Sequence, residues 1–302
     1  AEAILEKLAE AGVSPDGVDL LDDESRIGVK IPFGEISLPI LDQQNYDFTA
    51  CSLVLMLQYD EGLVSQLSNL DALVLSHAFG GDEPPVYAAD KGANLNVSYT
   101  QQSLKLADAE LSSLLGVLPA LHAANPITQI NAVFLRSAES WGKAGIDELA
   151  SQTVKLLNAQ PVSSTCYPVQ IAFNLIPVAS RSGLNFNLAR ALGNEKLACI
   201  HQIVDVPTFH GYGIAVQLKF SSNITVSACS DLLSGIHNVQ VKTSIASPIT
   251  DCNQSFSCVI TQLEQVPDEV NTIQFWMIVD PLRFGLANNY ANVSDILLKS
   301  FL

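Results

Sequence analysis

The stretch from Gly142 to Pro177 constrains the fold more than any other part of the sequence. Its first half repeats apolar residues at helical spacing, and its second half is an apolar run closed by proline. The apolar face of the predicted helix carries Ile146, Leu149, Ala150, Thr153, Leu156 and Leu157. The solvent-facing side carries Asp147, Glu148, Gln152 and Lys155. After a loop, we expect a strand from Val169 to Ile176.

The composition limits the class of protein. The chain has 302 residues, of which 48% are hydrophobic and 15% charged, enough for two domains or one large one. Its formal net charge of -16 argues against nucleic-acid binding, which needs a basic face, and against an anionic membrane surface. No apolar run is long enough to cross a bilayer. We therefore expect no nucleic-acid partner and no membrane insertion.

Six cysteines occur, and none forms a CxxC pair. Cys51 and Cys199 lie in apolar runs, where thiols are usually buried. Cys252 and Cys258 are the only close pair. They could form a disulfide in an oxidising compartment or remain free thiols, and both alternatives stay open.

The order of predicted elements divides the chain. Up to residue 106, short strands alternate with helices, which is typical of a parallel α/β sheet. The elements expected there are helices over 1–11 and 61–70 and strands over 47–57 and 73–76. A helix over 107–123 then begins a different pattern, in which strands follow one another more closely. These strands are expected at 129–135, 197–206, 214–220, 255–265 and 272–279, before a final helix over 292–302.

This second pattern predicts an α+β domain with a mixed or antiparallel sheet and helices on one face. The other face would be free for a partner. The expected boundaries are 1–106 for the first domain, 107–283 for the second, and 284–302 for the C-terminal helix.

The motifs GxxGxxEL, QTxxLLN and AFNxIP follow one another between Gly142 and Pro177. Their order resembles the middle of the aspartate-semialdehyde dehydrogenase family, and more closely its Usg-type members. The resemblance covers most of the chain and is weakest before Ala107. It implies a Rossmann-like NAD(P)-binding domain, then a dimerisation domain, then a final helix that returns to the first domain. It also implies a cytoplasmic homodimer.

The beginning of the sequence departs from this pattern. In the family, a strand and a glycine-rich turn precede the helix that AEAILEKLAEAG resembles, and the turn holds the pyrophosphate of the cofactor. We expect this first strand to be missing from the sequence rather than from the protein, because its loss would expose the centre of a parallel sheet. No cofactor is expected with this chain alone, and NADP is expected if a glycine-rich segment precedes it.

Four positions that the resemblance assigns to catalysis carry unsuitable residues. The family needs a cysteine nucleophile, an acyl-orienting glutamine, a carboxylate-binding arginine and a histidine base. These positions fall on Ala109, Arg136, Asp205 and Tyr212. An alanine methyl cannot attack an acyl group, and an aspartate would repel an acidic substrate. His210 is two residues from Tyr212 and would share its face on a strand, yet we interpret it as an ordinary hydrogen-bonded histidine.

Two further positions match the family where it approaches the nicotinamide, Gly285 and Asn289. Both also suit a helix entry, which is the interpretation we favour. No metal site is expected, because His201 and His210 are isolated.

The sequence therefore predicts a catalytically inactive, dimeric binding or scaffold protein whose protein partner is unknown, with the free sheet face as its binding surface. One alternative is an NADP-binding sensor. The other is an active NADP-dependent aldehyde oxidoreductase of the amino-acid biosynthesis type, using a relocated cysteine such as Cys166 or Cys199.

Overall fold

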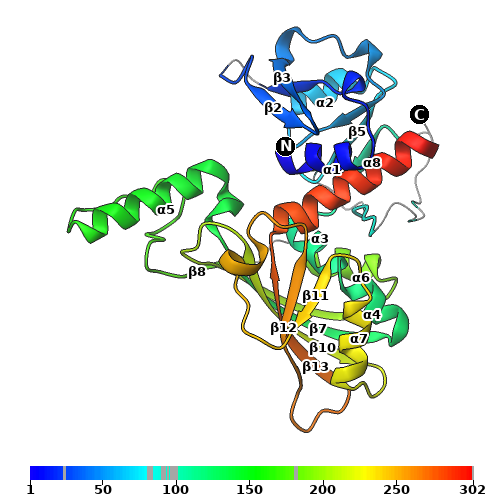
Figure 1. Cartoon of the computed structure of the whole chain (residues 1–302), viewed down its shortest axis with the longest axis vertical. Coiled ribbons are helices and arrows are strands. Elements are labelled where there is room, and N and C mark those ends of the chain that lie inside the picture. The colour runs from blue at the N-terminus through cyan, green and yellow to red at the C-terminus, as the bar shows by residue number, and fades with distance from the viewer. Residues whose placement is uncertain are drawn as a thin grey trace. The chain divides into compact units, whose positions relative to one another are not determined.

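The computed structural model describes residues 1–22, 25–79, 84–89, 93, 95, 101–179 and 183–300. The chain forms two compact units (Figure 1). Unit 1 contains residues 1–112 together with 285–302, and unit 2 contains residues 113–284.

Unit 1 has two small sheets. In one, β3 pairs in parallel with β1 and antiparallel with β2, and the other has the order β4-β5-β6 with parallel pairs. The strands are β1 (Leu20–Asp22), β2 (Lys30–Phe33), β3 (Ile36–Asp42), β4 (Leu53–Leu55), β5 (Leu73–Ser76) and β6 (Ser103–Lys105). The helices are α1 (Glu2–Glu10), α2 (Glu61–Leu67) and α8 (Asn288–Ser300), with 3-10 turns η1 (Pro15–Gly17), η2 (Gln43–Asn45) and η3 (Phe48–Ala50). Parallel pairing confirms the α/β class expected for this part.

Helix α1 follows the amphipathic pattern of its sequence. Ile4, Leu5 and Leu8 are buried, as predicted. The helix stops at Gly12, whose φ of 85° lies in the left-handed region that glycine adopts without strain.

Helix α8 is fixed in unit 1 by buried polar groups. The hydroxyl of Tyr290 donates to Met56 O at 3.0 Å and accepts from His77 N at 3.1 Å. The ring of Tyr290 is fully buried, and this burial raises the pKa of Tyr290 to about 12, so it remains a neutral donor. One side chain thus joins α8 to the ends of β4 and β5.

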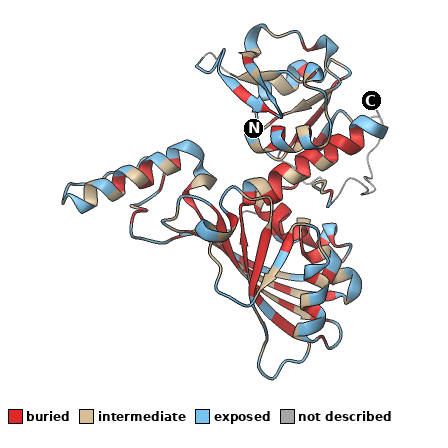
Figure 2. Cartoon of the chain, in the orientation of Figure 1, coloured by how far each residue is buried: buried red, intermediate tan, exposed pale blue. Residues whose placement is uncertain are grey.

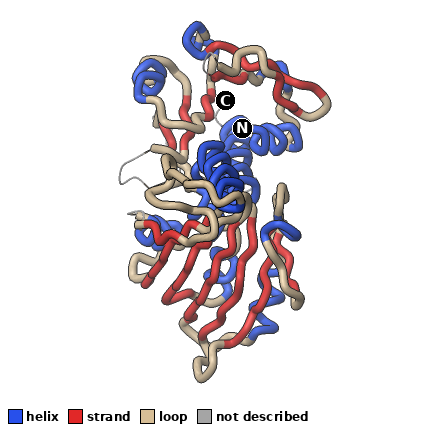
Figure 3. The backbone as a smooth tube through the Cα atoms, turned by 90° about the vertical axis from the view of Figure 1, so that its left-hand side faces the viewer, coloured by secondary structure: helices blue, strands red, loops and turns tan. Residues whose placement is uncertain are grey.

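Unit 2 is built on a seven-stranded mixed sheet with the order β11-β12-β13-β10-β7-β9-β8. The central strand β10 is antiparallel to both neighbours, whereas the pairs β7–β9 and β11–β12 are parallel. The strands, side by side in Figure 3, are β7 (Ile127–Arg136), β8 (Ile176–Val178), β9 (Ala198–Asp205), β10 (Tyr212–Phe220), β11 (Val239–Lys242), β12 (Cys258–Gln265) and β13 (Thr272–Val279). The α+β prediction with a mixed sheet is confirmed.

Helices cover one face of this sheet. Figure 1 shows α4, α6 and α7 on the same side of the sheet. Ile130, Ala132 and Phe134 of β7 are buried. Gln129 and Asn131 alternate with them onto the open face and are half-buried. The remaining elements are α3 (Ala109–Leu115), α4 (Leu118–Ala124), η4 (Ala138–Trp141), α5 (Gly142–Leu157), α6 (Leu184–Ala191), α7 (Val226–Ser234), and the π-helical η5 (Pro248–Cys252) and η6 (Pro281–Ala287).

Two predicted elements differ in form from the prediction. The strand predicted over 47–57 is limited to β4, because the carboxylate of Asp47 accepts Thr49 N and caps a 3-10 turn instead. The helix predicted over 107–123 divides into α3 and α4 between Leu115 and Leu118. Pro119 lacks the N–H that would bond to the carbonyl of Leu115, so one continuous helix cannot form.

The prediction for Gly142–Pro177 was right about the helix and wrong about its faces and about the strand. Glu148 and Gln152 are buried, whereas Leu157 is 74% exposed. Figure 2 shows buried, intermediate and exposed positions along α5. Only Ile176–Val178 forms a strand, because residues before it form a loop whose backbone bonds to α5. At Phe173 the φ of 59° is incompatible with an extended chain.

Candidate functional site

Arg136 and Asp205, at two of the positions assigned to catalysis, form a buried ion pair in unit 2. They end β7 and β9, and the parallel register places them directly opposite each other. The guanidinium donates through Nε at 2.7 Å and through a terminal nitrogen at 3.3 Å to the two carboxylate oxygens. Their exposed fractions are 3% and 1%. This fork geometry satisfies both charges inside the protein.

Trp141 completes this group from η4. Its Nε1 donates to Asp205 Oδ2 at 2.8 Å, and the guanidinium of Arg136 lies 5.7 Å from the ring centroid. Arg136 and Asp205 therefore bind each other and Trp141. An acidic acyl substrate would instead need an orienting amide at the first position and a free cation at the second.

Tyr212, at the position assigned to the base, is the first residue of β10 and is 2% exposed. Its hydroxyl lies 2.8 Å from Ser140 Oγ, again in η4. Unlike an imidazole, a phenol has no basic nitrogen that could accept a proton, so this side chain does not replace a histidine base. Three positions assigned to catalysis in unit 2 thus surround the same short turn.

His210 does not share a strand with Tyr212, which corrects the sequence-based expectation. It precedes β10, and Gly211, with a φ of 76°, turns the chain between them. The imidazole is 49% exposed, and its Nδ1 lies 3.1 Å from Glu139 Oε2. Glu139 also accepts Gly211 N at 2.6 Å through Oε1. This contact agrees with the interpretation of His210 as a hydrogen-bonded histidine.

A second buried carboxylate, Asp280, lies at the end of β13 and was not singled out from the sequence. It is 6% exposed and accepts the backbone N–H groups of Leu282 and Arg283 at 3.1 and 3.0 Å. Burial, together with the negative charge of Glu139, raises the pKa of Asp280 to about 6 despite these hydrogen bonds. The sequence gave no sign that this aspartate is buried, because Asp-Pro after a strand usually marks a turn at the surface.

Ala109, at the nucleophile position, begins α3 and is half-buried. The nearby Ser112 is fully buried, and its hydroxyl donates to Ala107 O at 3.0 Å. Neither side chain offers a free nucleophile.

The alternative cysteines are poorly suited to replace it. Burial, with the charges of Glu148 and Asp205, raises the pKa of the Cys166 thiol. Burial raises the pKa of the Cys199 thiol to about 11. Because only the thiolate attacks, both environments disfavour a nucleophile. All six cysteines are free thiols, and Cys51 and Cys199 are half-buried rather than buried.

Gly285 and Asn289, the positions assigned to the cofactor, are both buried. The amide of Asn289 accepts Ala88 N at 2.9 Å and donates to Val86 O at 3.1 Å, so both its polar atoms bind backbone. Gly285 lies within η6.

In the described ranges, no group of three or more His, Cys, Asp or Glu side chains converges as a metal site. No helix in the described part of the chain combines the length and apolarity needed to cross a bilayer.

The middle of the chain matches a known protein family. Residues 118–284 match the dimerisation domain of semialdehyde dehydrogenase, which is more than half of the 302 residues. The chain belongs to the semialdehyde dehydrogenase family, as the sequence motifs indicated.

Particular relatives are distant. Aspartate-semialdehyde dehydrogenase 2 of Vibrio cholerae is 26% identical over 200 residues, covering 62% of this chain and 59% of that protein. The aspartate-semialdehyde dehydrogenase of Legionella pneumophila is 24% identical, covering 91% and 86%. The USG-1 protein homolog of Pseudomonas aeruginosa is 23% identical and covers 100% of this chain and 95% of its own.

Solved structures share the fold over the whole chain. Aspartate semialdehyde dehydrogenase II of Vibrio cholerae, complexed with ASA, has a TM-score of 0.86 at 21% identity, covering 100% of this chain and 95% of that chain. A probable aspartate-semialdehyde dehydrogenase from Pseudomonas aeruginosa has a TM-score of 0.83 at 21% identity, covering 100% and 97%. At these identities the likeness concerns the fold alone.

Proposed function

We propose that this chain is a catalytically inactive member of the semialdehyde dehydrogenase family that acts by binding, as a dimer. The observation that carries the proposal is the buried Arg136–Asp205 ion pair, supported by Ala109 at the nucleophile position. Position 205 carries an aspartate instead of the cation that would hold a substrate carboxylate. The only cation of the pair, Arg136, is neutralised by this aspartate. The activity that we propose is lost is the one in the names of the relatives, aspartate-semialdehyde dehydrogenase.

The dimeric part of the proposal rests on residues 118–284, which match a dimerisation domain. Unit 2 has two candidate surfaces for association. One is the open sheet face, where a hollow of about 250 Å³ is lined by amides such as Asn131, Gln217 and Gln274, beside Trp276. The other is the segment that contains α5.

The activity test is an assay of NADP reduction with aspartate semialdehyde as substrate. The aspartate-semialdehyde dehydrogenase of Vibrio cholerae serves as the positive control. We expect no turnover above that of heat-denatured protein. Steady turnover that thiol alkylation abolishes would overturn the proposal and support a relocated cysteine.

The cofactor test is a calorimetric titration of the same sample with NADP. We expect no binding, because Asn289 is fully bonded to backbone in unit 1. Micromolar binding without turnover would instead support the NADP-binding sensor.

A further inference from the structure

Four segments of unit 2 converge around Gly211. An added Cβ at this glycine would lie 2.7 Å from Pro248 Cβ and 3.4 Å from Val279 O, so its neighbours approach closely. Its N–H donates to Glu139 Oε1 at 2.6 Å. The turn before β10, η4, η5 and the end of β13 therefore meet at one place in the unit.

Two buried carboxylates lie at this meeting point. The side chains of Glu139 and Asp280 are each 8% exposed, and the negative charge of Glu139 acts on Asp280. Burial and this charge raise the pKa of Asp280 to about 6. Asp280 is therefore mostly ionised at pH 7.5, although it is removed from water and faces a like charge.

Neighbouring cations balance only part of this negative charge. The Nε of Arg283 lies 3.9 Å from Asp280 Oδ2, whereas His210, which contacts Glu139, is charged only when it is protonated. The ion pairs between β7 and β9 and between β11 and η5 are each neutral within themselves. With a neutral His210, two carboxylates face one guanidinium, and one negative charge is left over.

One oxygen of Asp280 is an open acceptor. Oδ1 accepts the N–H groups of Leu282 and Arg283, but no group in the described part of the chain lies within hydrogen-bond distance as a donor to Oδ2. A buried carboxylate oxygen without a donor is costly, and a cationic donor from a partner would remove this cost. A single open oxygen suits an ammonium group, which is a compact point charge, better than a guanidinium, whose planar fork needs two acceptors.

Exposed apolar side chains surround the carboxylates. Phe209, whose carbonyl accepts Glu139 N, is 42% exposed, and Ile249 of η5 is 71% exposed. Leu282 at the start of η6 is 41% exposed. Single exposed apolar residues are ordinary, but three on converging segments are typical of an interaction surface. This surface thus combines apolar contacts with a buried negative charge.

We propose that this surface binds an apolar segment of a partner protein that carries one lysine. The lysine ammonium binds Asp280 Oδ2, and the apolar flanks of the segment pack on Phe209, Ile249 and Leu282. Charge favours such a partner, because a chain of net charge -16 attracts basic segments and repels acidic ones. The inference rests on the proposed binding function and names the chemistry of its partner.

Calorimetric titration at pH 7.5 and about 0.15 M salt tests the lysine. The probes are the capped pentapeptide leucine-serine-lysine-serine-leucine and the same peptide with glutamine in place of lysine. We expect the lysine peptide to bind wild-type protein about tenfold or more tightly than the glutamine peptide, as for a hydrogen bond to a charged group. Equal affinities, or no binding of either peptide, would overturn the proposal.

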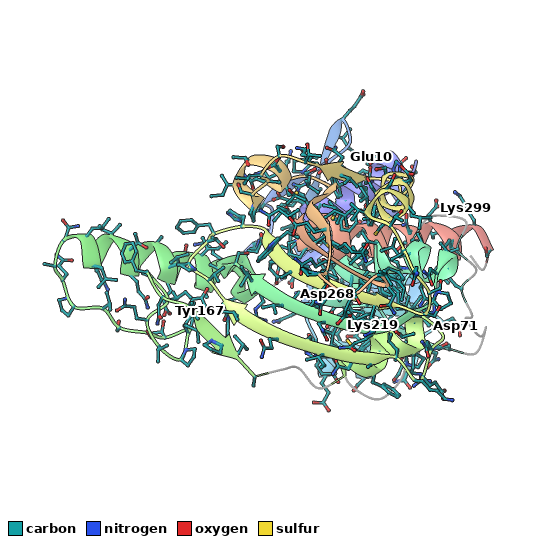
Figure 4. The ribbon with its side chains drawn as sticks, turned by 90° about the horizontal axis from the view of Figure 1, so that it is seen from below. Glu10, Asp71, Tyr167, Lys219, Asp268 and Lys299 are labelled. Atoms are coloured by element: carbon teal, nitrogen blue, oxygen red, sulfur yellow. The ribbon has the colours of Figure 1, made fainter. Side chains whose placement is uncertain are left out.

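The variant Asp280→Asn tests the position of the lysine and should reduce its affinity to that of the glutamine peptide. The matched control is Asp268→Asn, because Asp268, labelled in Figure 4, is an exposed aspartate in the turn at the other end of β13. Asparagine tolerates the φ of 63° at this position. A lysine preference that survives Asp280→Asn unchanged would overturn the site.

The variant Ile249→Ser tests the apolar part. It should weaken both peptides about threefold or more, whereas Val270→Ser, at a 62%-exposed valine in the same turn as Asp268, should change neither. Unchanged affinities in Ile249→Ser would overturn the apolar contact. Butylamine is the third probe, and binding as tight as that of the lysine peptide would overturn docking of a protein segment in favour of a small amine.

The outcomes separate this inference from the proposed function. Turnover in the dehydrogenase assay would overturn the proposed function, whatever the peptides do. Absence of both turnover and lysine preference would overturn the lysine-binding surface alone.

Discussion

Gln152 donates from Nε2 to Glu148 Oε1 at 2.9 Å, one turn apart in α5, and both side chains are buried. Each also binds the loop over residues 158–175, since Glu148 Oε2 accepts Thr165 N and Cys166 N and Gln152 Oε1 accepts Ile171 N. Helix α5 packs against a loop whose N–H groups at these positions donate to side chains of the helix. The buried face of α5 therefore carries polar acceptors as well as apolar side chains.

The variant Glu148→Gln is expected to loosen the contact between α5 and this loop. Burial disfavours the charge of Glu148, but the hydrogen bonds from Cys166 and Thr165 outweigh it and hold the pKa of Glu148 below its usual value. A lowered carboxylate pKa stabilises the fold above about pH 4.3, and this stability is lost as the pH falls through the folded-state pKa. Urea unfolding at pH 7 should show a loss of about 1.5–3 kcal/mol in the variant.

The exposed Glu195 provides the control for this experiment. Glu195→Gln should leave the free energy of unfolding nearly unchanged at both neutral and acidic pH. If Glu148→Gln lost no more than this control at pH 7, the loop would not depend on the carboxylate.

The variant Asp280→Asn should be more stable than wild type above pH 6. The pKa of Asp280 is raised to about 6, so the folded state holds a proton that the unfolded state releases near pH 3.9. The protonated Asp280 carboxyl therefore contributes fully to the free energy of unfolding below about pH 3.9. This contribution is lost as the pH rises through 6. The gain of the variant at pH 8 is at most about 3 kcal/mol, and it should vanish near pH 4. Thermal unfolding across this range measures it, with the exposed Asp71→Asn as control.

Replacing one partner of the Arg136–Asp205 pair should cost more than replacing both. Arg136→Met or Asp205→Leu alone leaves a buried charge unpaired, which costs about 3–5 kcal/mol. The double variant removes both charges and should recover much of this loss, apart from the hydrogen bond of Trp141. A double-mutant cycle in urea measures the coupling, and simply additive losses would contradict an ion pair.

A methyl group at Gly145 should disturb the contact between α5 and η4. An added Cβ would lie 2.5 Å from Trp141 Cβ and 2.6 Å from Ala138 O, closer than real contacts allow. We expect Gly145→Ala to destabilise the protein by about 1–3 kcal/mol through this overpacking. Gly17→Ala is the matched control, because no atom lies within 4 Å of its added Cβ. Equal melting temperatures for the two variants would refute the close contact.

The variant Tyr290→Phe should destabilise unit 1 without creating a cavity. It leaves Met56 O and His77 N without the hydroxyl that bonds to both, at a cost of about 1–3 kcal/mol. Hydrogen exchange of the His77 amide measures this directly, since its protection should fall in the variant. Unchanged exchange would show that another group binds this amide.

Several features followed from the local sequence alone. The amphipathic spacing of Ile4, Leu5 and Leu8 predicted α1, and the apolar runs at 73–76 and 272–279 coincide with β5 and β13. The motifs from Gly142 to Pro177 identified the family. These signals succeed because periodicity and motif order depend on neighbours in the chain.

Other features depended on contacts between distant segments. The sequence assigned residues 136 and 205 to lost functions, but only the parallel register of β7 and β9 makes them an ion pair. Glu139 and Asp280 acquired their environment in the same way, from segments far apart in the chain.

By itself, the sequence determined the order of most elements and the family, and it predicted alanine at the nucleophile position, because each is carried by residue identity and local spacing. The tertiary structure decided which side of α5 is buried, why the chain at Phe173 is not extended, and how Arg136 and Asp205 neutralise each other. Burial and hydrogen-bond partners come from segments that meet only when the chain folds, so polarity along one helix could not reveal them.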